Sequence, residues 1–357
     1  MFNTQCKQVN LKMWRVVVHF EQQPAWIVFS SPQNVSTAWF WKEQTFQTPL
    51  RCEMDASTVT SVSDQKSTLW VGRAIAENLD NSQNTAGLVI SPGGLPGASF
   101  LIGALPALFE HVPGPFVTLT GNSVGAIATF FLAQQPPGKE ADAAVKMANA
   151  LAKMPSIADP APPVQTGKTA ATVAFLNKLM PKQFELYGRD VSWGSVAVSK
   201  MGTVSNPMDA YHVFRPALLP MHEITSSVVA SCTICSLMYS PILYTQTTGF
   251  QEWIDGGYLD MLPLRNVNRL PARLYVIAMP PFTTGHFQIE KETLLKLWET
   301  SWARYWKQIE FLQQVAKVQI TTITPSSTVF GTTLSQNMVQ MIENALNGRL
   351  AVLNALL

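Results

Sequence analysis

Short apolar runs alternate with glycine turns and helical stretches from residue 87 onward. Leu88-Val89-Ile90 is an apolar run, and apolar residues with helical spacing follow over Ala98–Glu110. The pattern repeats at once, with an apolar run at Phe116–Thr120, a glycine turn and an apolar helix at Val124–Ala133. Two strand-turn-helix units in tandem predict an α/β fold with a parallel sheet.

The C-terminal third continues this pattern. It predicts a buried strand at Arg273–Met279, a long helix from about Glu290 to Val318, and an amphipathic helix from about Leu334 to the end. In the long helix, tryptophans recur every four residues at positions 298, 302 and 306, with cations nearby. Such a face is typical of a helix packed on a sheet and equally of a helix at a lipid surface, so both interpretations stay open.

Two regions differ from the rest of the chain. Residues 1–85 contain β-rich runs separated by polar turns, which predicts a β-rich N-terminal extension, either a small domain or extra strands on the main sheet. Residues 86–357 form the predicted main domain. Residues 136–190 are rich in Pro and Ala with an irregular middle, and we expect a lid-like insertion there.

Composition narrows the class of protein. The chain has 357 residues, of which 47% are hydrophobic and 13% are charged, with a formal net charge of +2. This suits a large buried core and argues against a nucleic-acid partner, because a phosphate backbone requires clustered cations. Uncharged stretches are interrupted by Gly and Pro, and the N-terminus lacks the pattern of a secretory signal. We therefore expect a cytoplasmic protein or one peripheral at membranes.

The four cysteines favour reduced thiols. They are too few and too scattered for a disulfide framework. Cys232 and Cys235 have the CxxC spacing of redox and metal sites, but no second CxxC accompanies them. We interpret both as small core-lining residues and expect neither a metal nor a cofactor.

A candidate nucleophile lies between the second predicted strand and its helix. Ser123 is the centre of Gly121-Asn122-Ser123-Val124-Gly125, which has the Gly-x-Ser-x-Gly pattern of a nucleophile elbow. An N-capping serine in a glycine turn has the same local sequence. A serine hydroxyl also requires a base, and none of the five histidines lies in a recognisable triad motif.

Four segments together resemble the patatin-like phospholipase family, in the order of that family. They are a glycine-rich segment, the elbow, an Ala-Ser segment and an Asp-Gly-Gly segment, at Pro92–Ala98, Gly121–Gly125, Ala230–Pro241 and Trp253–Pro263. The resemblance extends over roughly Gly87–Met279, covers the C-terminal helices loosely and does not include the first 85 residues.

This resemblance implies a fold and a chemistry. The fold is a three-layer α/β/α sandwich of patatin-like type with a mainly parallel central sheet. The activity is that of a phospholipase A or lysophospholipase, in which Ser123 is the nucleophile, Asp255 is its base, and Gly93 and Gly94 donate to the oxyanion. The partner is a phospholipid or another acyl-ester lipid, with peripheral membrane contact.

The sequence departs from the family at two prolines. Pro92 stands where the first glycine of the oxyanion segment is usual, and Pro96 stands where a basic residue is common. Proline has no N–H, so these changes reduce the number of possible oxyanion donors. They motivate the alternative of a non-catalytic lipid-binding or interaction protein on a degenerate patatin scaffold. A third alternative, an α/β-hydrolase with a Ser-Asp-His triad, would need a late histidine such as His286.

Overall fold

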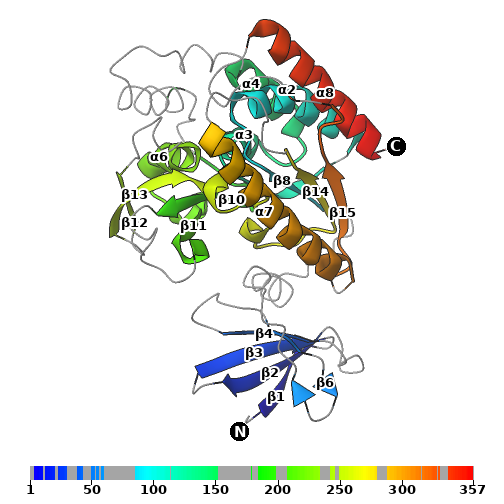
Figure 1. Ribbon diagram of the computed structural model, residues 1–357. Helices are drawn as coiled ribbons and strands as arrows, with labels where there is room; N and C mark the ends of the chain where they lie inside the picture. Colours follow the sequence, from blue (N-terminus) through cyan, green and yellow to red (C-terminus); the bar gives the residue numbers. More distant parts are fainter. Residues whose placement is uncertain are drawn as a thin grey trace.

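A computed structural model gives the fold of the chain (Figure 1). It describes residues 4–10, 13–20, 23–29, 38–42, 50–52, 54–55, 58–59, 85–112, 114–151, 178, 184–197, 207–233, 242–245, 249–279, 288–314, 316–327, 329 and 337–356. For the described residues within 4–59 and for 151, 242–245, 249–251, 288–295 and 297, the structure describes the backbone alone.

An eight-stranded mixed sheet forms the centre of the molecule. Five neighbouring strands run parallel in the order β10-β9-β8-β14-β15: Asp190–Ala197, Phe116–Gly121, Ala86–Ile90, Arg273–Ile277 and Gln319–Ile323. Three strands joined by antiparallel pairing lie on the β10 side: β11 Tyr211–Phe214, β12 Ile242–Thr245 and β13 Gly249–Asp255. The predicted α/β fold with a mainly parallel sheet is confirmed.

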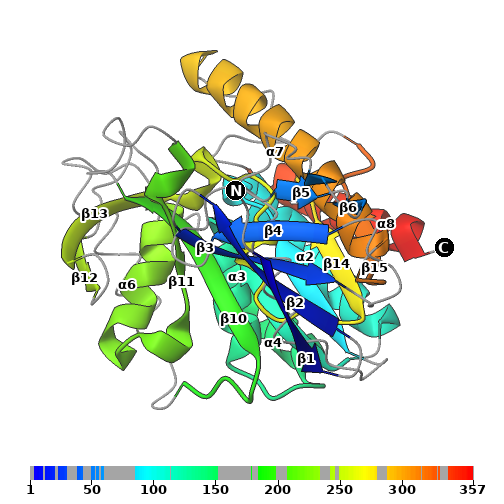
Figure 2. The same cartoon turned by 90° about the horizontal axis from the view of Figure 1, so that it is seen from below.

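Side chains alternate between the two faces of the sheet, and helices cover both faces (Figure 2). In β8, Leu88 and Ile90 belong to one core cluster and Val89 to the other, because successive side chains of a strand point to opposite faces. The first cluster contains residues of α2 Gly94–His111, α3 Val124–Ala133, α4 Glu140–Leu151, α6 Met221–Cys232 and α8 Met338–Leu356. The second contains residues of α7 Gln288–Gln314. The arrangement is three-layered.

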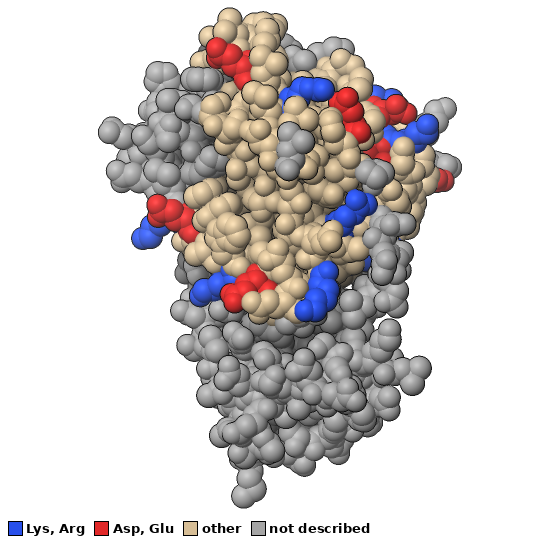
Figure 3. All heavy atoms as spheres, turned by 90° about the vertical axis from the view of Figure 1, so that its right-hand side faces the viewer, with Lys and Arg blue, Asp and Glu red and all other residues tan. Residues whose placement is uncertain are grey.

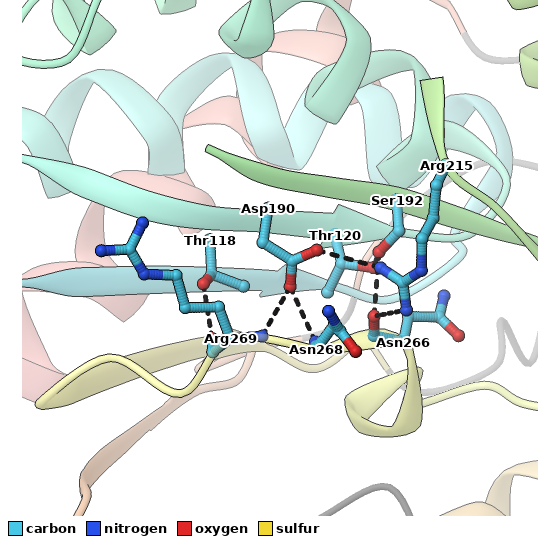
Figure 4. A network of polar contacts seen from close by, with 8 residues as sticks. All are labelled: Thr118, Thr120, Asp190, Ser192, Arg215, Asn266, Asn268 and Arg269. Atoms are coloured by element: carbon cyan, nitrogen blue, oxygen red, sulfur yellow. Dashed lines mark hydrogen bonds and ion pairs between the residues drawn. The ribbon is translucent and has the colours of Figure 1, made fainter. Parts of the chain in front are cut away.

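Polar side chains on β9 and β10 hold the segment that leads from β13 to β14 (Figure 4). Asp190 Oδ2 accepts hydrogen bonds from the backbone N–H groups of Asn268 (2.7 Å) and Arg269 (2.9 Å), and its Oδ1 accepts one from Arg215 (2.9 Å). Thr118 Oγ1 donates to the Arg269 carbonyl at 2.7 Å. The segment between β13 and β14 is therefore bound directly to β9 and β10.

The structure corrects several predicted boundaries. The long helix ends at Gln314, and the predicted extension to Val318 is wrong because β15 begins at Gln319 and pairs with β14. The run Gln319–Ile323 is rich in Thr and Ile, which fit a strand between neighbours better than a helix end. Helix α2 begins at Gly94, four residues before the predicted start, so most of the glycine-rich segment is its first turn.

The N-terminal strands form sheets of their own. Strands β1 to β5 pair in sequence order into an antiparallel sheet: Thr4–Asn10, Met13–Phe20, Gln23–Phe29, Ala38–Lys42 and Leu50–Cys52. Strands β6 Met54–Asp55 and β7 Thr58–Val59 pair with each other. The division into an extension over 1–85 and a main domain over 86–357 stays a prediction.

The region predicted as a lid is described in part. Helix α4 begins it, and Ala143, Ala144 and Met147 of this helix are buried in the first core cluster. Residues 152–177 lie outside the described residues. The lid-like insertion near 136–190 is therefore still a prediction.

The surface has few charges. On the face in Figure 3, acidic and basic side chains are scattered among uncharged ones. On α7, Tyr305 is buried, and Trp302 stacks on both Trp298 and Tyr305, while Trp306 is half exposed. The aromatic face of α7 thus packs on the sheet along one side and meets solvent along the other. In the part of the chain that the structure describes, none of the helices has the length and apolarity needed to cross a membrane.

Candidate active site

Ser123 lies in a sharp turn between β9 and α3. Its backbone has φ 56° and ψ −127°, a left-handed conformation that costs a non-glycine residue roughly 1–3 kcal/mol. The turn is tight because Gly121 packs on the backbone of Gly125, and Gly125 packs on the carbonyl of Ile90 in β8. A Cβ atom at either glycine would collide with backbone atoms. The elbow geometry predicted from Gly-x-Ser-x-Gly is therefore present.

The main chain of Ser123 is held by the end of helix α6. Its N–H donates to both the carbonyl and the Oγ of Ser231, each at 3.1 Å. The thiol of Cys232 donates to its carbonyl at 3.0 Å. Because the Ser123 N–H points into the protein, stabilisation of an oxyanion needs other donors.

Asp255 lies at the end of β13, beside the nucleophile. Its backbone is fixed by antiparallel pairing with Ser195 of β10 and by a 2.8 Å hydrogen bond from its N–H to the Thr233 carbonyl. The carboxylate accepts a hydrogen bond from the Ser123 side chain and another, at 2.7 Å, from the N–H of Gly257. The structure thus brings together two residues that are 255 − 123 = 132 positions apart in the chain.

Burial sets the acidity of Asp255. The residue is 6% exposed, and desolvation raises the pKa of its carboxyl to about 7, against the smaller opposing effects of the hydrogen bonds from Ser123 and Gly257. Burial, and next the charge of Asp255, raise the pKa of the neighbouring Cys232 thiol. At neutral pH Asp255 therefore exchanges protons readily, while Cys232 keeps its proton.

The glycine-rich segment contacts residues that are close in sequence to both catalytic candidates. The ring of Pro92 packs on Gly257, where an added Cβ would be 2.8 Å from Pro92 Cγ. In the first turn of α2, Gly97 faces Val124, with 3.3 Å between an added Cβ and Val124 Cγ1. The first turns of α2 and α3 therefore meet beside Ser123. Both helix N-termini direct their partial positive charge toward this point.

The two glycines expected to donate to the oxyanion lie at the N-terminus of α2. Gly93 is the N-cap residue, and Gly94 is the first helical residue, with a positive φ of 55°. The N–H groups in the first turn of a helix have no acceptor within that helix. Pro96 also lies in this first turn, where a missing N–H breaks no helical hydrogen bond but removes one possible donor.

Three histidines have side chains that the structure describes, and each of them contacts other groups. His111 contacts the Ala107 carbonyl through Nδ1 at 2.9 Å, and His222 is largely exposed beside Glu223. The ring of His212 packs on Phe214 and Trp253. His286 and Cys235 lie outside the described residues, so the triad alternative and the CxxC interpretation are still untested.

Three buried polar residues around the elbow were not predicted as site residues from the sequence: Asn122, Tyr211 and Ser231. Asn122 is the variable residue before Ser123 in the Gly-x-Ser-x-Gly motif, and the motif does not predict what its side chain contacts. Ser231 lies in the Ala-Ser segment, and the contact with Ser123 depends on how α6 packs. Tyr211 has no local sequence signal, because its role comes from the pairing of β11 with β10.

Comparisons with known proteins give a distant structural likeness. No family model matches the chain, and no curated protein matches it. Among solved structures, the crystal structure of VipD from Legionella pneumophila is similar, with a TM-score of 0.36 and 14% sequence identity, over 76% of this chain and 67% of that chain. The resemblance to patatin-like phospholipases therefore stays a prediction from the motifs.

Proposed function

We propose that the chain is a serine hydrolase of lipid acyl esters, acting through an acyl-Ser123 intermediate. The observation that carries this proposal is the hydrogen bond from Ser123 to Asp255, a buried carboxyl whose pKa is raised to about 7. A hydroxyl nucleophile requires a base near its working pH, and Asp255 meets that requirement without a histidine. The strained elbow adds support, because such strain is concentrated at functional sites.

In the acylation step, Asp255 takes the proton of Ser123 as its Oγ attacks the acyl carbonyl carbon. The carbonyl oxygen becomes an oxyanion, which the N–H groups of Gly93 and Gly94 stabilise; each such donor contributes roughly 3 kcal/mol in hydrolases. Collapse of this intermediate breaks the ester bond, and the leaving alkoxide takes the proton from Asp255. Water, deprotonated by Asp255, then attacks the acyl carbonyl carbon. Collapse of this second intermediate breaks the bond to Ser123 Oγ, which takes the proton back from Asp255, and the fatty acid is released.

The substrate class is a fatty acyl ester of a phospholipid or lysophospholipid. The order of the four motifs supports this class by their resemblance to patatin-like phospholipases. The partly exposed tryptophans of α7 fit contact with the surface of a lipid aggregate. Peripheral membrane contact is part of the same proposal.

The proposal is tested with a fluorophosphonate probe and with phospholipid vesicles. We expect covalent labelling and release of fatty acid by the unmodified protein, and loss of both in Ser123→Ala. Asp255→Asn should lower kcat by roughly 10⁴- to 10⁶-fold, the range that removal of the orienting aspartate or of the base gives in other serine hydrolases. Ser326→Ala, at an exposed serine that bonds to Asn347, is the matched control and should retain both activities. Full turnover in Ser123→Ala would overturn the mechanism.

The second candidate is a non-catalytic lipid-binding or interaction protein. Pro92 favours it, because a proline at the start of the oxyanion segment supplies no N–H and instead fills space against Gly257. The same labelling experiment separates the candidates. Lipid binding without fluorophosphonate labelling and without fatty acid release would support the non-catalytic protein.

A further inference from the structure

Asn122, the residue before the nucleophile, is the centre of a buried hydrogen-bond cluster. It is 0% exposed. Its Nδ2 donates to the Tyr211 hydroxyl at 2.9 Å and to the Asp260 carbonyl at 2.8 Å. Its Oδ1 accepts from the N–H of Gly194 at 2.8 Å and from Asn266 Nδ2 at 3.2 Å. Every hydrogen-bonding position of this amide is therefore used.

The chemistry of its partners fixes the orientation of the amide. The N–H of Gly194 can only donate and the Asp260 carbonyl can only accept, so a flipped Asn122 would oppose both. Tyr211 has one hydroxyl proton. Asn266 Oδ1, at 2.9 Å, and Asn122 Oδ1, at 3.1 Å, both lie within hydrogen-bond distance of this hydroxyl. The proton goes to Asn266 Oδ1, because Asn122 Oδ1 already accepts from Gly194 and Asn266. The cluster thus has a single arrangement in which all its groups are satisfied.

The cluster joins the two halves of the proposed catalytic pair. Gly194 precedes Ser195, the residue that pairs with Asp255, and its carbonyl accepts from Ser231, which holds the N–H of Ser123. On the other side, Asp260 belongs to the turn that follows Asp255. One amide therefore links the nucleophile turn, the strand beside the base and the loop after it.

Two further observations show that the neighbouring elements are shaped around this cluster. The Tyr211 hydroxyl occupies the space that a Cβ at Gly194 would need, so no larger residue fits there. The main chain of Asn266 is itself anchored: its carbonyl accepts from Ser192 Oγ at 3.0 Å and from Arg215 Nη2 at 3.2 Å (Figure 4). Asn122 thus bonds to groups that the sheet already holds rigidly.

We propose that Asn122 is a positioning residue, which holds the nucleophile turn against the strand and loop that carry Asp255. This inference rests on the proposed function. Small displacements of reacting groups reduce the rate of a chemical step far more than they weaken substrate binding. Loss of the cluster should therefore appear in kcat.

The test compares two matched variants. Asn122→Asp keeps the shape of the side chain but replaces the donor facing the Asp260 carbonyl with an oxygen. Asn347→Asp makes the same change at a remote Asn that is also buried and bonds to Ser326 and Ser327. Both are assayed on a chromogenic acyl ester at a temperature where thermal unfolding shows each to be folded.

We expect Asn122→Asp to lower kcat at least 100-fold with KM changed less than threefold, and Asn347→Asp to change kcat less than twofold. An equal fall in kcat in both variants, or a change confined to KM, would overturn the inference. If Asn122→Asp does not fold, Tyr211→Phe replaces it. This variant should lower kcat about tenfold, and an unchanged kcat would be the contrary result.

The unmodified protein separates the two levels of the proposal. If it hydrolyses the ester and Asn122→Asp does so equally well, the positioning role fails while the proposed function stands. If the unmodified protein neither hydrolyses esters nor reacts with a fluorophosphonate, the proposed function fails and this inference fails with it.

Discussion

The backbone N–H of Gly257 donates a 2.7 Å hydrogen bond to Asp255 Oδ1. The same carboxylate also accepts a hydrogen bond from the Ser123 side chain. A Cβ at Gly257 would meet both Pro92 and Asp255 Oδ1, so the second residue of Asp-Gly-Gly supports the base and the glycine-rich segment together. The burial of Asp255 and these contacts determine how the site should respond to pH and to substitution.

The rate of ester hydrolysis should depend on pH through Asp255. Because burial raises the pKa of Asp255 to about 7, the base is protonated and inactive below that pH. We expect kcat/KM to fall about tenfold per pH unit below an apparent pKa near 7 and to level off above it. The measurement is a pH profile with a soluble acyl ester. Asp142→Asn, at an exposed carboxylate on α4, is the control and should leave this fall in kcat/KM unchanged. A fall that begins only near pH 4 in the unmodified protein would contradict the prediction.

The free energy of unfolding should also depend on pH through Asp255, but it should fall with rising pH where the rate of hydrolysis rises. A carboxyl whose pKa is 3.8 when unfolded and about 7 when folded binds its proton more tightly in the folded state, so its contribution is lost as pH rises from about 4 to 7. One pKa unit corresponds to about 1.4 kcal/mol, which makes the loss roughly 4 kcal/mol at most. We expect Asp255→Asn to remove this pH dependence from the free energy of unfolding in urea. A variant less stable than the unmodified protein at pH 8 would show that the hydrogen bonds outweigh the desolvation.

The backbone strain at Ser123 should lower the free energy of unfolding. Ser123 has a φ of 56°, which glycine adopts without a steric penalty. Ser123→Gly and Ser123→Ala both remove the hydroxyl, but only the glycine variant relieves the backbone. We therefore expect Ser123→Gly to unfold with a free energy about 1–2 kcal/mol higher than that of Ser123→Ala. Equal unfolding free energies would mean that the turn is unstrained.

The end of α3 should depend on a buried ion pair. Arg189 Nη2 contacts Glu140 Oε1 at 2.7 Å, and Arg189 Nη1 donates to the carbonyls of Leu132 and Gln135. Removing one partner of a buried pair leaves an uncompensated charge, which costs about 3–5 kcal/mol. We expect Arg189→Met to lower the free energy of unfolding by that amount, and Glu140→Gln in the same chain to recover part of it. Additive losses in the double variant would contradict the coupling.

The local elements of the main domain were predictable from periodicity and glycine spacing. The helix Val124–Ala133 was predicted with its observed bounds, because an apolar run of this length that follows a glycine turn favours a buried helix. The C-terminal end of α7 was not predicted, because the run after Gln314 becomes a strand only beside β14. The start of α2 was missed because glycines and a proline in its first turn oppose a helix by propensity.

The sequence by itself determined the α/β pattern and the sharp turn at Ser123, since both depend on residues within a few positions of one another. Only the tertiary structure decided that Asp255 lies against Ser123, that Pro92 packs on Gly257, and that Asn122 meets Tyr211. These contacts join residues far apart in the chain, and they depend on strand order and burial. Desolvation, which raises the pKa of Asp255 to about 7, exists only once the sheet and its helices enclose the carboxyl.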